Sequence, residues 1–255
     1  MPGHDLVLLT EAAEAAGQEA LRYWRKDPKV WEKGDGAGPV TEADLAVDAL
    51  LADRLQGARP DYGWLSEETE DGPDRLSKSR VFILDPIDGT RSFIAGERTW
   101  AISVAVVEDG VPVAGVIYLP ARDVIFAATA EAATRNGARI GVRDPVEASS
   151  IDILAPRAAM DALGWTDGRE AKRHFRPSLA YRMALVAEGR FDAMITLRDA
   201  WEWDIAAGSV IARAAGAAVS DRAGQALRFN SRNAKTDGVL VADQRSHGRL
   251  MNALS

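Results

Sequence analysis

Apolar residues near the start of the chain recur every three or four positions. This spacing continues from about residue 5 to residue 25 and predicts an amphipathic helix. The helix is expected to end near Asp27 and Pro28. The residues that form its apolar stripe are Leu6, Leu9, Ala13, Ala16, Ala20 and Trp24.

A glycine-rich stretch separates this helix from a second one. Residues 34–39 read GDGAGP, which is too rich in glycine for regular structure, so we predict a mobile loop there. A second helical pattern then opens with Val40 and Thr41 and runs through about Leu55.

The pattern next changes to short strands. The apolar run Val81–Leu84 is too short for a helix and is bounded by polar residues, so it predicts a strand with Asp85 at its carboxyl end. Residues 101–107 and 111–118 flank a Glu-Asp-Gly turn signal and predict a hairpin, and residues 123–128 predict a third strand. The middle of the chain is therefore expected to be mainly antiparallel sheet.

Helical and strand patterns alternate in the remainder of the chain. The sheet pattern stops near Arg143, so we predict two halves, residues 1–142 and 143–255. No long linker separates the halves, which are expected to pack as one globular unit with a site between them. In the second half we predict helices at 178–188, at 205–215 and near residue 250, and strands at 191–196 and 238–242.

Composition and charge exclude several kinds of protein. The 255 residues include no cysteine, which excludes disulfides, a thiolate nucleophile and a cysteine zinc site. The formal net charge of -7 argues against a nucleic-acid polymer as partner, because phosphate backbones are held by surplus Lys and Arg. No apolar run approaches the roughly 20 residues of a membrane span, and the start lacks the pattern of an export signal. We expect a soluble, cytoplasmic protein without a membrane partner.

The strongest chemical signal is the stretch Asp85–Thr90, with the sequence DPIDGT. It places two carboxylates three residues apart at a strand end, which is costly unless metal cations occupy the cluster. Gly89 and Thr90 can offer backbone N–H groups to an anion at the start of a helix. A plain turn is the alternative, because Asp, Pro and Gly each favour turns.

Two further acids stand at the ends of predicted elements. Glu67 follows the apolar pair Trp64–Leu65, and Asp204 follows Trp203 at the start of a helical pattern. Asp204 as a helix N-cap and Glu67 as a solvated surface residue are the alternatives. A single carboxylate cluster accounts for all of these acids together, whereas the alternatives require a separate explanation for each.

These residues, in this order, resemble the inositol monophosphatase superfamily of magnesium-dependent, lithium-sensitive phosphatases. The resemblance covers nearly the whole chain, and DPIDGT combined with a downstream WDIAAG is far more specific than either motif alone. It implies a mixed α/β fold, a layered α/β/α/β/α sandwich of the sugar-phosphatase type, and hydrolysis of a phosphomonoester. The matching motifs are Lys33, Thr41–Asp44, Ser66–Glu68, Asp85–Thr90 and Trp203–Gly208.

The resemblance also implies a set of magnesium ligands. Glu67, Asp85 and the backbone carbonyl of Ile87 would bind one Mg²⁺, and Asp85, Asp88 and Asp204 would bind a second. Glu67 would also hold a weaker third ion with water, as in relatives, and we count it among the catalytic residues as well as the metal ligands. Oxygen ligands suit Mg²⁺, whereas the three histidines show no paired metal spacing.

The family pattern assigns roles in catalysis and phosphate binding to other residues. Asp44 and Thr90 would orient and deprotonate the attacking water, and the Gly89 and Thr90 amides would bind the phosphate. Asp44 has a structural alternative, because Thr41 and Asp44 also form a capping-box pattern. Lys33 resembles the family's mobile lysine near the metal site, with an exposed surface charge as its alternative.

The choice of phosphate ester depends on weaker signals. Inositol monophosphatases commonly place a Glu seven residues before the last metal Asp, and Leu197 stands there. A basic residue after the motif threonine resembles bacterial 3'(2'),5'-bisphosphate nucleotidases, so Arg91 is a candidate to bind a second phosphate, with an ion pair to Glu97 as its alternative. The Gly-Ser-Ser of such nucleotidases is replaced by the residues around Ser178.

We therefore expect a magnesium-dependent phosphatase that acts on a small phosphorylated metabolite, in the first place 3'-phosphoadenosine 5'-phosphate. Inositol monophosphate and then histidinol phosphate are the alternative substrates. A catalytically silent, metal-binding regulator is the alternative from another class, although the complete acid set argues against it. A homodimer is the candidate assembly.

Overall fold

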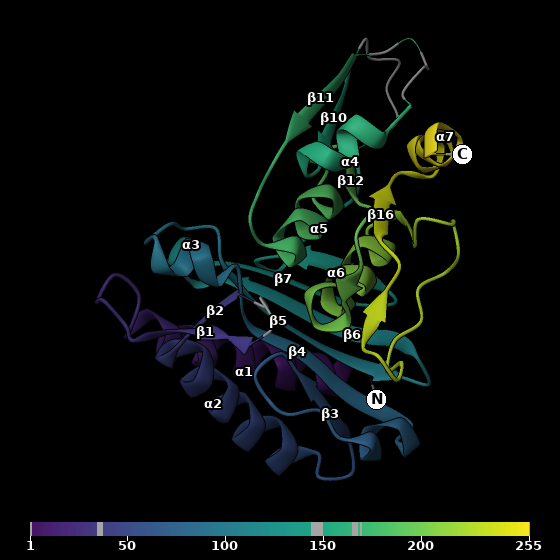
Figure 1. Ribbon diagram of the computed structural model, residues 1–255. Coiled ribbons are helices and arrows are strands. Elements are labelled where there is room, and N and C mark those ends of the chain that lie inside the picture. Colours follow the sequence, from purple (N-terminus) through teal and green to yellow (C-terminus); the bar gives the residue numbers. More distant parts are fainter. Residues whose placement is uncertain (1, 35–37, 144–149, 165–167, 169, 255) are drawn as a thin grey trace.

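The computed structural model describes residues 2–34, 38–143, 150–164, 168 and 170–254 (Figure 1). A seven-stranded sheet carries helices on both faces, and a five-stranded sheet lies beyond one of these helix layers. The chain thus forms alternating layers of helices and sheets.

The larger sheet is built from the middle of the chain. β3 runs parallel to β4, and the other neighbouring pairs are antiparallel. The predicted hairpin and third strand are confirmed. Across the sheet the strands are β3 (Gly63–Ser66), β4 (Arg80–Asp88), β5 (Ala101–Glu108), β6 (Val111–Leu119), β7 (Val124–Thr129), β8 (Ala132–Arg135) and β9 (Ala138–Arg139).

Two pairs of helices cover the faces of this sheet. One pair comes from the start of the chain and the other from its second half, so both halves contribute to one packed body. The helices are α1 (Pro2–Leu21) and α2 (Glu42–Ala58) on one face, and α5 (Leu179–Ala187) and α6 (Glu202–Ala214) on the other.

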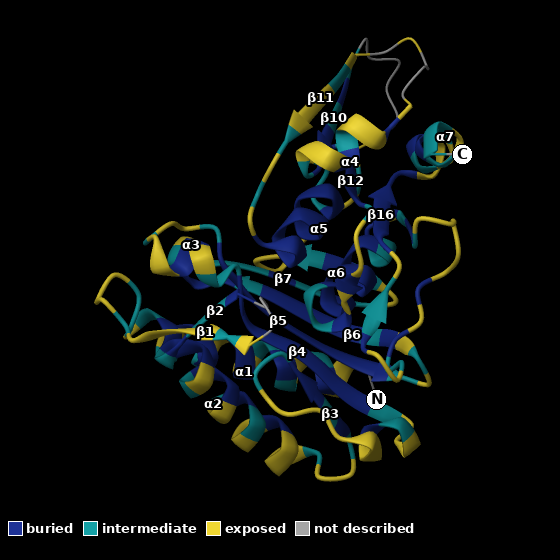
Figure 2. Ribbon diagram, viewed as in Figure 1, coloured by how far each residue is buried: buried dark blue, intermediate teal, exposed yellow. Residues whose placement is uncertain are grey.

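β4 packs against both helix layers, because its apolar side chains alternate between two cores. Phe82 and Leu84 pack in the core beneath α1 and α2, whereas Val81 and Ile83 pack in the core formed with α5 and α6. Successive side chains of a strand point to opposite faces, so a continuous apolar run is what a doubly covered strand requires. Figure 2 shows β4 and its neighbour β5 as buried between the two helix layers.

The smaller sheet adds a further layer on the outer side of α5 and α6. One of its faces packs against these two helices, and the other packs with α4 (Arg157–Ala162) and α7 (Gln244–Leu254). The five layers α/β/α/β/α confirm the predicted sandwich. In order the strands are β11 (Glu170–His174), β10 (Ser150–Leu154), β12 (Ala193–Thr196), β16 (Val239–Ala242) and β14 (Ala218–Ser220).

Short elements connect these layers. Two small antiparallel pairs and a short helix lie beside the larger sheet, and 3₁₀ turns occur at residues 73–77 and 120–122. The elements are β1 (Val30–Lys33) with β2 (Gly38–Thr41), β13 (Ala200–Trp201) with β15 (Lys235–Thr236), and α3 (Thr90–Ile94).

Two expectations for the first forty residues need correction. α1 ends at Leu21 rather than near Pro28, because the chain turns through 3₁₀-type hydrogen bonds and reaches a left-handed residue at Arg25 (φ 61°). The glycine-rich stretch is flanked by paired strands, since Gly38 and Pro39 belong to β2. The centre of the predicted mobile loop, residues 35–37, lies outside the described residues.

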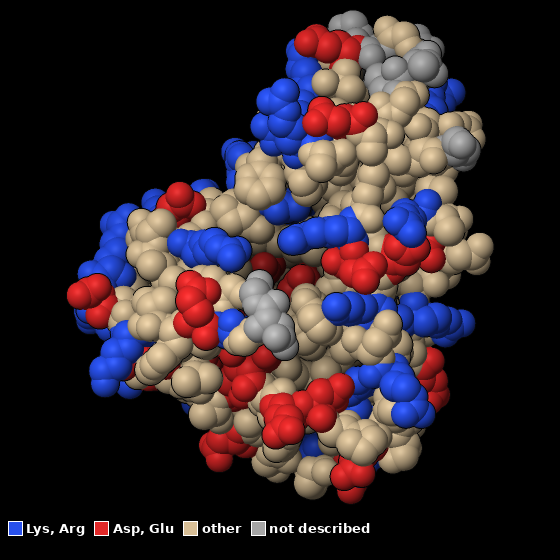
Figure 3. Space-filling model, viewed as in Figure 1, with Lys and Arg blue, Asp and Glu red and all other residues tan. Residues whose placement is uncertain are grey.

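The strands of the larger sheet precede residue 140, and those of the smaller sheet follow residue 149. The division into residues 1–142 and 143–255 remains our proposal, because residues 144–149 lie outside the described part of the chain. A hollow opens between these parts, and Figure 3 shows acidic side chains in its depth and basic ones around its mouth. None of the described helices has both the length and the apolar character that a bilayer crossing requires.

Candidate active site

Two parallel strands bring the first acids together. β3 pairs with β4 so that Ser66 lies opposite Leu84, which puts the carboxyl ends of both strands at the same edge of the sheet. Glu67 follows β3 directly, and its N–H donates to the Leu84 carbonyl at 3.3 Å. Glu67 and Asp85 are therefore neighbours because of strand pairing, although they are distant in the sequence.

β4 is irregular where it carries the acidic motif. Asp85 lies opposite Ser103 and Asp88 lies opposite Ala101, so β4 has one residue more than β5 between these pairs. Pro86 lies in this bulge, and proline lacks the N–H group that a regular ladder requires. The turn alternative thus captures part of the local geometry, but the motif remains within the strand.

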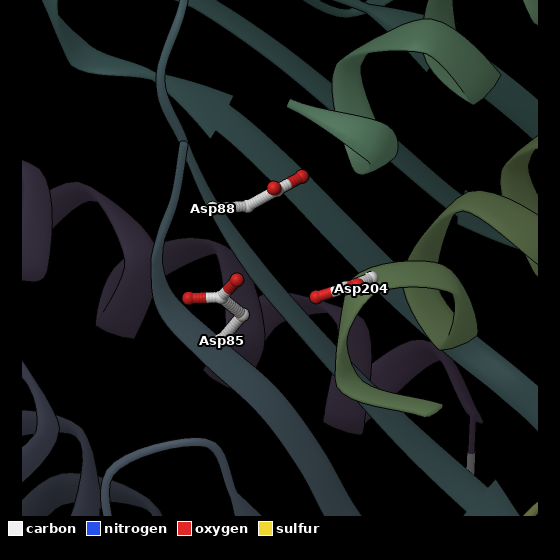
Figure 4. Close-up of side chains that lie close together, drawn as sticks. All are labelled: Asp85, Asp88 and Asp204. Atoms are coloured by element: carbon white, nitrogen blue, oxygen red, sulfur yellow. The ribbon is translucent and has the colours of Figure 1, made fainter. Parts of the chain in front are cut away.

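The bulge lets two carboxylates of β4 face a third one from α6. Asp85, Asp88 and Asp204 each offer an oxygen, and these atoms lie within 4.8 Å of one another (Figure 4). The Asp85 carboxylate is oriented by the Ile87 N–H, which donates to its Oδ1 at 2.9 Å. The structure thus brings the three predicted aspartates together from two elements of opposite halves.

Asp204 lies in the first turn of α6 and is not its N-cap. The helix is preceded by Trp201 as N-cap, without a side-chain capping bond, which makes Asp204 its third residue. The N-cap alternative for Asp204 is therefore wrong. Its acidic side chain in the first turn still interacts favourably with the positive end of the helix.

The acids repel one another in this arrangement. Burial and the charges of Glu67, Asp88 and Asp204 raise the pKa of Asp85 well above its ordinary value. Burial and the charges of Asp88 and Glu67 do the same to the pKa of Asp204. Divalent cations would relieve this repulsion, and carboxylate oxygens are the ligands that Mg²⁺ prefers. The residues therefore fit a magnesium site.

Asp88 is anchored at the start of α5. Its Oδ2 accepts hydrogen bonds from the Ser178 hydroxyl and from the Ala180 N–H, both at 2.7 Å. Burial raises the pKa of Asp88 to about 6, although these hydrogen bonds act in the opposite direction. This role of Ser178 was not predicted. The signal for it was its place at the start of the helix predicted over residues 178–188, where a serine side chain commonly serves as an N-cap.

Asp44 serves α2 and the site at the same time. Its Oδ2 accepts from the Thr41 N–H at 2.8 Å and from the Thr41 hydroxyl at 2.6 Å, which confirms the capping box. Its Oδ1 accepts from the Thr90 hydroxyl at 3.2 Å. Burial raises the pKa of Asp44. Capping and a role in the site are therefore compatible, since each uses a different carboxylate oxygen.

Thr90 and Gly89 connect β4 to α3. The Thr90 hydroxyl lies 3.2 Å from the Ile87 carbonyl as well as from Asp44, so it can donate to either. Gly89 adopts a left-handed conformation (φ 102°) that favours glycine. The first N–H groups of a helix have no partner within it, and both Gly89 and Thr90 line the pocket. Their amides are thus available to an anion.

Lys33 lies beside Glu67 and Glu68 and is not a free surface charge. Its Nζ donates to Glu67 and to Glu68, each at 2.7 Å, and only 17% of its side chain is exposed. Burial alone would lower the pKa of Lys33, but the two glutamates outweigh this effect and raise it. Glu67 is likewise held by an ion pair within the site, which replaces the alternative of a solvated surface residue.

A pocket of about 640 Å³ contains the site. The acids form part of its lining, and Figure 3 shows basic side chains on both sides of its mouth. Its volume is in the range of small-molecule sites. The lining residues are Pro39, Glu67, Asp85, Asp88, Gly89, Thr90, Arg91, Ser92, Glu97, Pro156, Phe175, Pro177, Arg182, Arg198 and Asp204.

The pocket wall from the second half differs from the sequence expectation. Leu197 is absent from the lining and packs against the core between the smaller sheet and α4 and α7, whereas the next residue, Arg198, lines the pocket. Arg182 and Phe175 also line it and were missed. The signal for Arg182 was a charged residue within an apolar helix, since all of α5 is buried.

Arg91 lines the pocket as expected, but the alternative of an ion pair with Glu97 is wrong. Glu97 instead accepts hydrogen bonds from Ser92 at 2.8 Å and from Thr99 at 3.2 Å. Trp201 stacks on Trp203 with 4.5 Å between ring centroids, and neither lines the pocket.

Comparisons with known proteins agree with this geometry. The model of the inositol monophosphatase family matches residues 4–255. The 3'(2'),5'-bisphosphate nucleotidase CysQ of Escherichia coli is 30% identical over 230 residues, covering 87% of this chain and 92% of its own. The inositol-1-monophosphatase of Synechocystis is 30% identical over 270 residues, covering 98% and 88%.

A solved structure shares the fold. The extragenic suppressor protein suhB from Bartonella henselae has a TM-score of 0.83 and 28% identity, over 99% of this chain and 98% of that one. The chain belongs to the inositol monophosphatase family and is a phosphoric monoester hydrolase. The family is magnesium-dependent, in keeping with the acidic cluster.

Proposed function

We propose that this phosphatase is a magnesium-dependent 3'(2'),5'-bisphosphate nucleotidase that acts on 3'-phosphoadenosine 5'-phosphate. The observation that carries the proposal is a pocket that combines an acidic cluster with three arginines, Arg91, Arg182 and Arg198. The second phosphate of a bisphosphorylated substrate could pair with these arginines, whereas an uncharged polyol ring offers them no anionic partner. The likeness to CysQ supports the same substrate, although the inositol monophosphatase relative has the same identity.

The acids suggest where magnesium binds. Glu67, Asp85 and the Ile87 carbonyl would hold one ion, and Asp85, Asp88 and Asp204 a second, with Glu67 also near a weaker third. Bound Mg²⁺ would neutralise phosphoryl oxygens and lower the pKa of a bound water, so that a nucleophilic hydroxide is available near neutral pH.

The chain's own residues supply position and proton transfer. The Thr90 hydroxyl donates a hydrogen bond to the Asp44 carboxylate, so this pair would orient the attacking water and accept its proton. The amides of Gly89 and Thr90 would hold the phosphate for direct in-line displacement. The bond from water oxygen to phosphorus forms as the ester bond breaks, and the leaving alkoxide takes up a proton. No phosphoenzyme is formed.

Lys33 and Arg91 would assist substrate binding from the first half of the chain. Lys33 already pairs with Glu67 and Glu68, so the negative charge at that edge of the site stabilises a cation there. A bound phosphate would give Lys33 a further anionic partner.

A substrate panel tests this function. We expect magnesium-dependent phosphate release with the highest kcat/KM for 3'-phosphoadenosine 5'-phosphate, above inositol 1-phosphate and histidinol phosphate. Chelation should abolish release, and millimolar Li⁺ should inhibit it while Na⁺ at the same concentration does not. A higher kcat/KM for inositol 1-phosphate would overturn the nucleotidase proposal and leave the phosphatase class intact. Release from none of the esters would favour a silent metal-binding protein.

A further inference from the structure

Two arginines from the second half form a basic wall beside the metal-binding acids. Arg182 comes from α5, the helix whose start anchors Asp88, and Arg198 lies between β12 and β13. Both side chains line the pocket. They are close enough for the charge of Arg198 to act on Arg182, and Asp88 and Asp204 act on Arg182 as well.

Arg182 is held firmly although it is buried. Its Nε donates to the Arg176 carbonyl and its Nη2 to the Pro177 carbonyl at 3.2 Å, while its guanidinium stacks on the Phe175 ring with 4.5 Å to the centroid. Within the described part of the chain, its Nη1 has no hydrogen-bond acceptor. Burial lowers the pKa of Arg182 to about 10, so the group stays positively charged at neutral pH. A rigid, charged guanidinium with a spare donor is therefore present in the wall.

Arg198 is exposed, and its side chain forms no hydrogen bond or ion pair with any other residue that the structure describes. Two guanidinium groups near one another repel unless an anion lies between them. The acids that act on Arg182 are Asp88 and Asp204, which are candidate metal ligands and so are not reserved for the arginines. The pair consequently lacks a dedicated anionic partner within the described residues.

We propose that Arg182 and Arg198 bind a second phosphate group of the substrate, so that the pocket selects bisphosphorylated metabolites. The inference rests on the proposed phosphatase site, which cleaves the first phosphate at the acids. Two guanidinium groups can engage several phosphate oxygens at once, which a single side chain such as Arg91 cannot match. Arg91 lies on the other wall, in the helix that follows the phosphate-binding amides, where its guanidinium packs beside Gly38.

Substrate pairs that differ only in the second phosphate test the inference. We would compare adenosine 3',5'-bisphosphate with adenosine 3'-phosphate, and fructose 1,6-bisphosphate with fructose 1-phosphate. Because Arg198 is exposed, Arg198→Ala should fold. We expect it to lower kcat/KM for the bisphosphates about 10- to 100-fold more than for the monophosphates, through KM, as lost charge-assisted hydrogen bonds require. Arg198→Lys should restore part of the preference.

Two further variants make the comparison specific. Arg54→Ala removes an exposed arginine of α2 that does not line the pocket, and it should leave the bisphosphate-to-monophosphate ratio of kcat/KM in both pairs at the wild-type value. Arg91→Ala tests the opposite wall. If Arg91→Ala causes the selective loss and Arg198→Ala lowers both members of each pair equally, the inference is overturned and Arg91 is the binder of the second phosphate.

A binding measurement separates this inference from the proposed function. Adenosine 3',5'-bisphosphate should raise the Tm of the wild type more than adenosine 3'-phosphate does, and Arg198→Ala should remove the difference. Absence of adenosine 3',5'-bisphosphate hydrolysis by the wild type would reject the nucleotidase proposal, but the difference in Tm would still support the second-phosphate site. Hydrolysis of both members with equal KM would reject the second-phosphate site alone.

Discussion

The Thr90 hydroxyl donates to Oδ1 of Asp44 at 3.2 Å, while Oδ2 of the same carboxylate caps α2 through Thr41. One side chain thus fixes the start of a helix and faces the hydroxyl at the start of another. Each of the two functions that the sequence offered for Asp44 uses its own oxygen, which allows them to be separated by mutation.

Asp44→Asn should lower kcat by about 10²- to 10³-fold, because an amide cannot accept the proton of the attacking water. The control is Thr41→Ala, which removes the capping hydroxyl and should cost about 1 kcal/mol of stability with little change in kcat. Steady-state kinetics and thermal unfolding of both variants make the measurement. If Asp44 only caps α2, both variants would lose stability and keep kcat.

Asp88→Asn should keep the fold and lose nearly all turnover. An asparagine carbonyl can still accept from Ser178 and Ala180, but the lost charge weakens a metal site built from three carboxylates. We expect a smaller rise in Tm with Mg²⁺ and a kcat near background at saturating Mg²⁺. Asp53→Asn, at an exposed position of α2, is the control. A wild-type kcat for Asp88→Asn would contradict the metal assignment.

Lys33→Met should destabilise the metal-free protein by several degrees in Tm, because Glu67 and Glu68 lose the cation that lies 2.7 Å from each. Added Mg²⁺ should reduce this difference, since it supplies positive charge to Glu67. Lys78→Met at an exposed position is the matched control. Equal Tm values for the two variants and the wild type would mean that the ion pairs of Lys33 contribute nothing to stability.

The metal-free protein should lose stability as the pH rises from about 4 to about 6. Burial raises the pKa of Asp88 from 3.8 to about 6 in the folded state, so the folded chain binds more protons than the unfolded chain in this window. The free energy of unfolding then falls with rising pH. Thermal unfolding at several pH values in chelator should show this slope, and Asp88→Asn should reduce it, while Asp85 and Asp204, whose pKa values are also raised, maintain the remainder. A Tm that rises steadily across the window in both proteins would contradict the raised pKa.

Much of the local structure could be predicted from sequence because it depends on near neighbours. The apolar run Val81–Leu84 gave a buried strand, and the turn signal after residue 107 gave the hairpin of β5 and β6. The strands β10 and β11 were missed. They pair in parallel over a connection that includes α4, and parallel pairing leaves no turn signal beside the strands.

The sequence by itself determined which acids could act together, because the motifs around Glu67, Asp85, Asp88 and Asp204 carry the same chemistry wherever the fold puts them. Only the tertiary structure decided which side chains complete the site. The hydrogen bond from Ser178 to Asp88 and the nearness of Arg182 to Arg198 join distant segments. Likewise, Leu197 faces the core while Arg198 faces the pocket. Such contacts follow from how the layers pack, which no local pattern specifies.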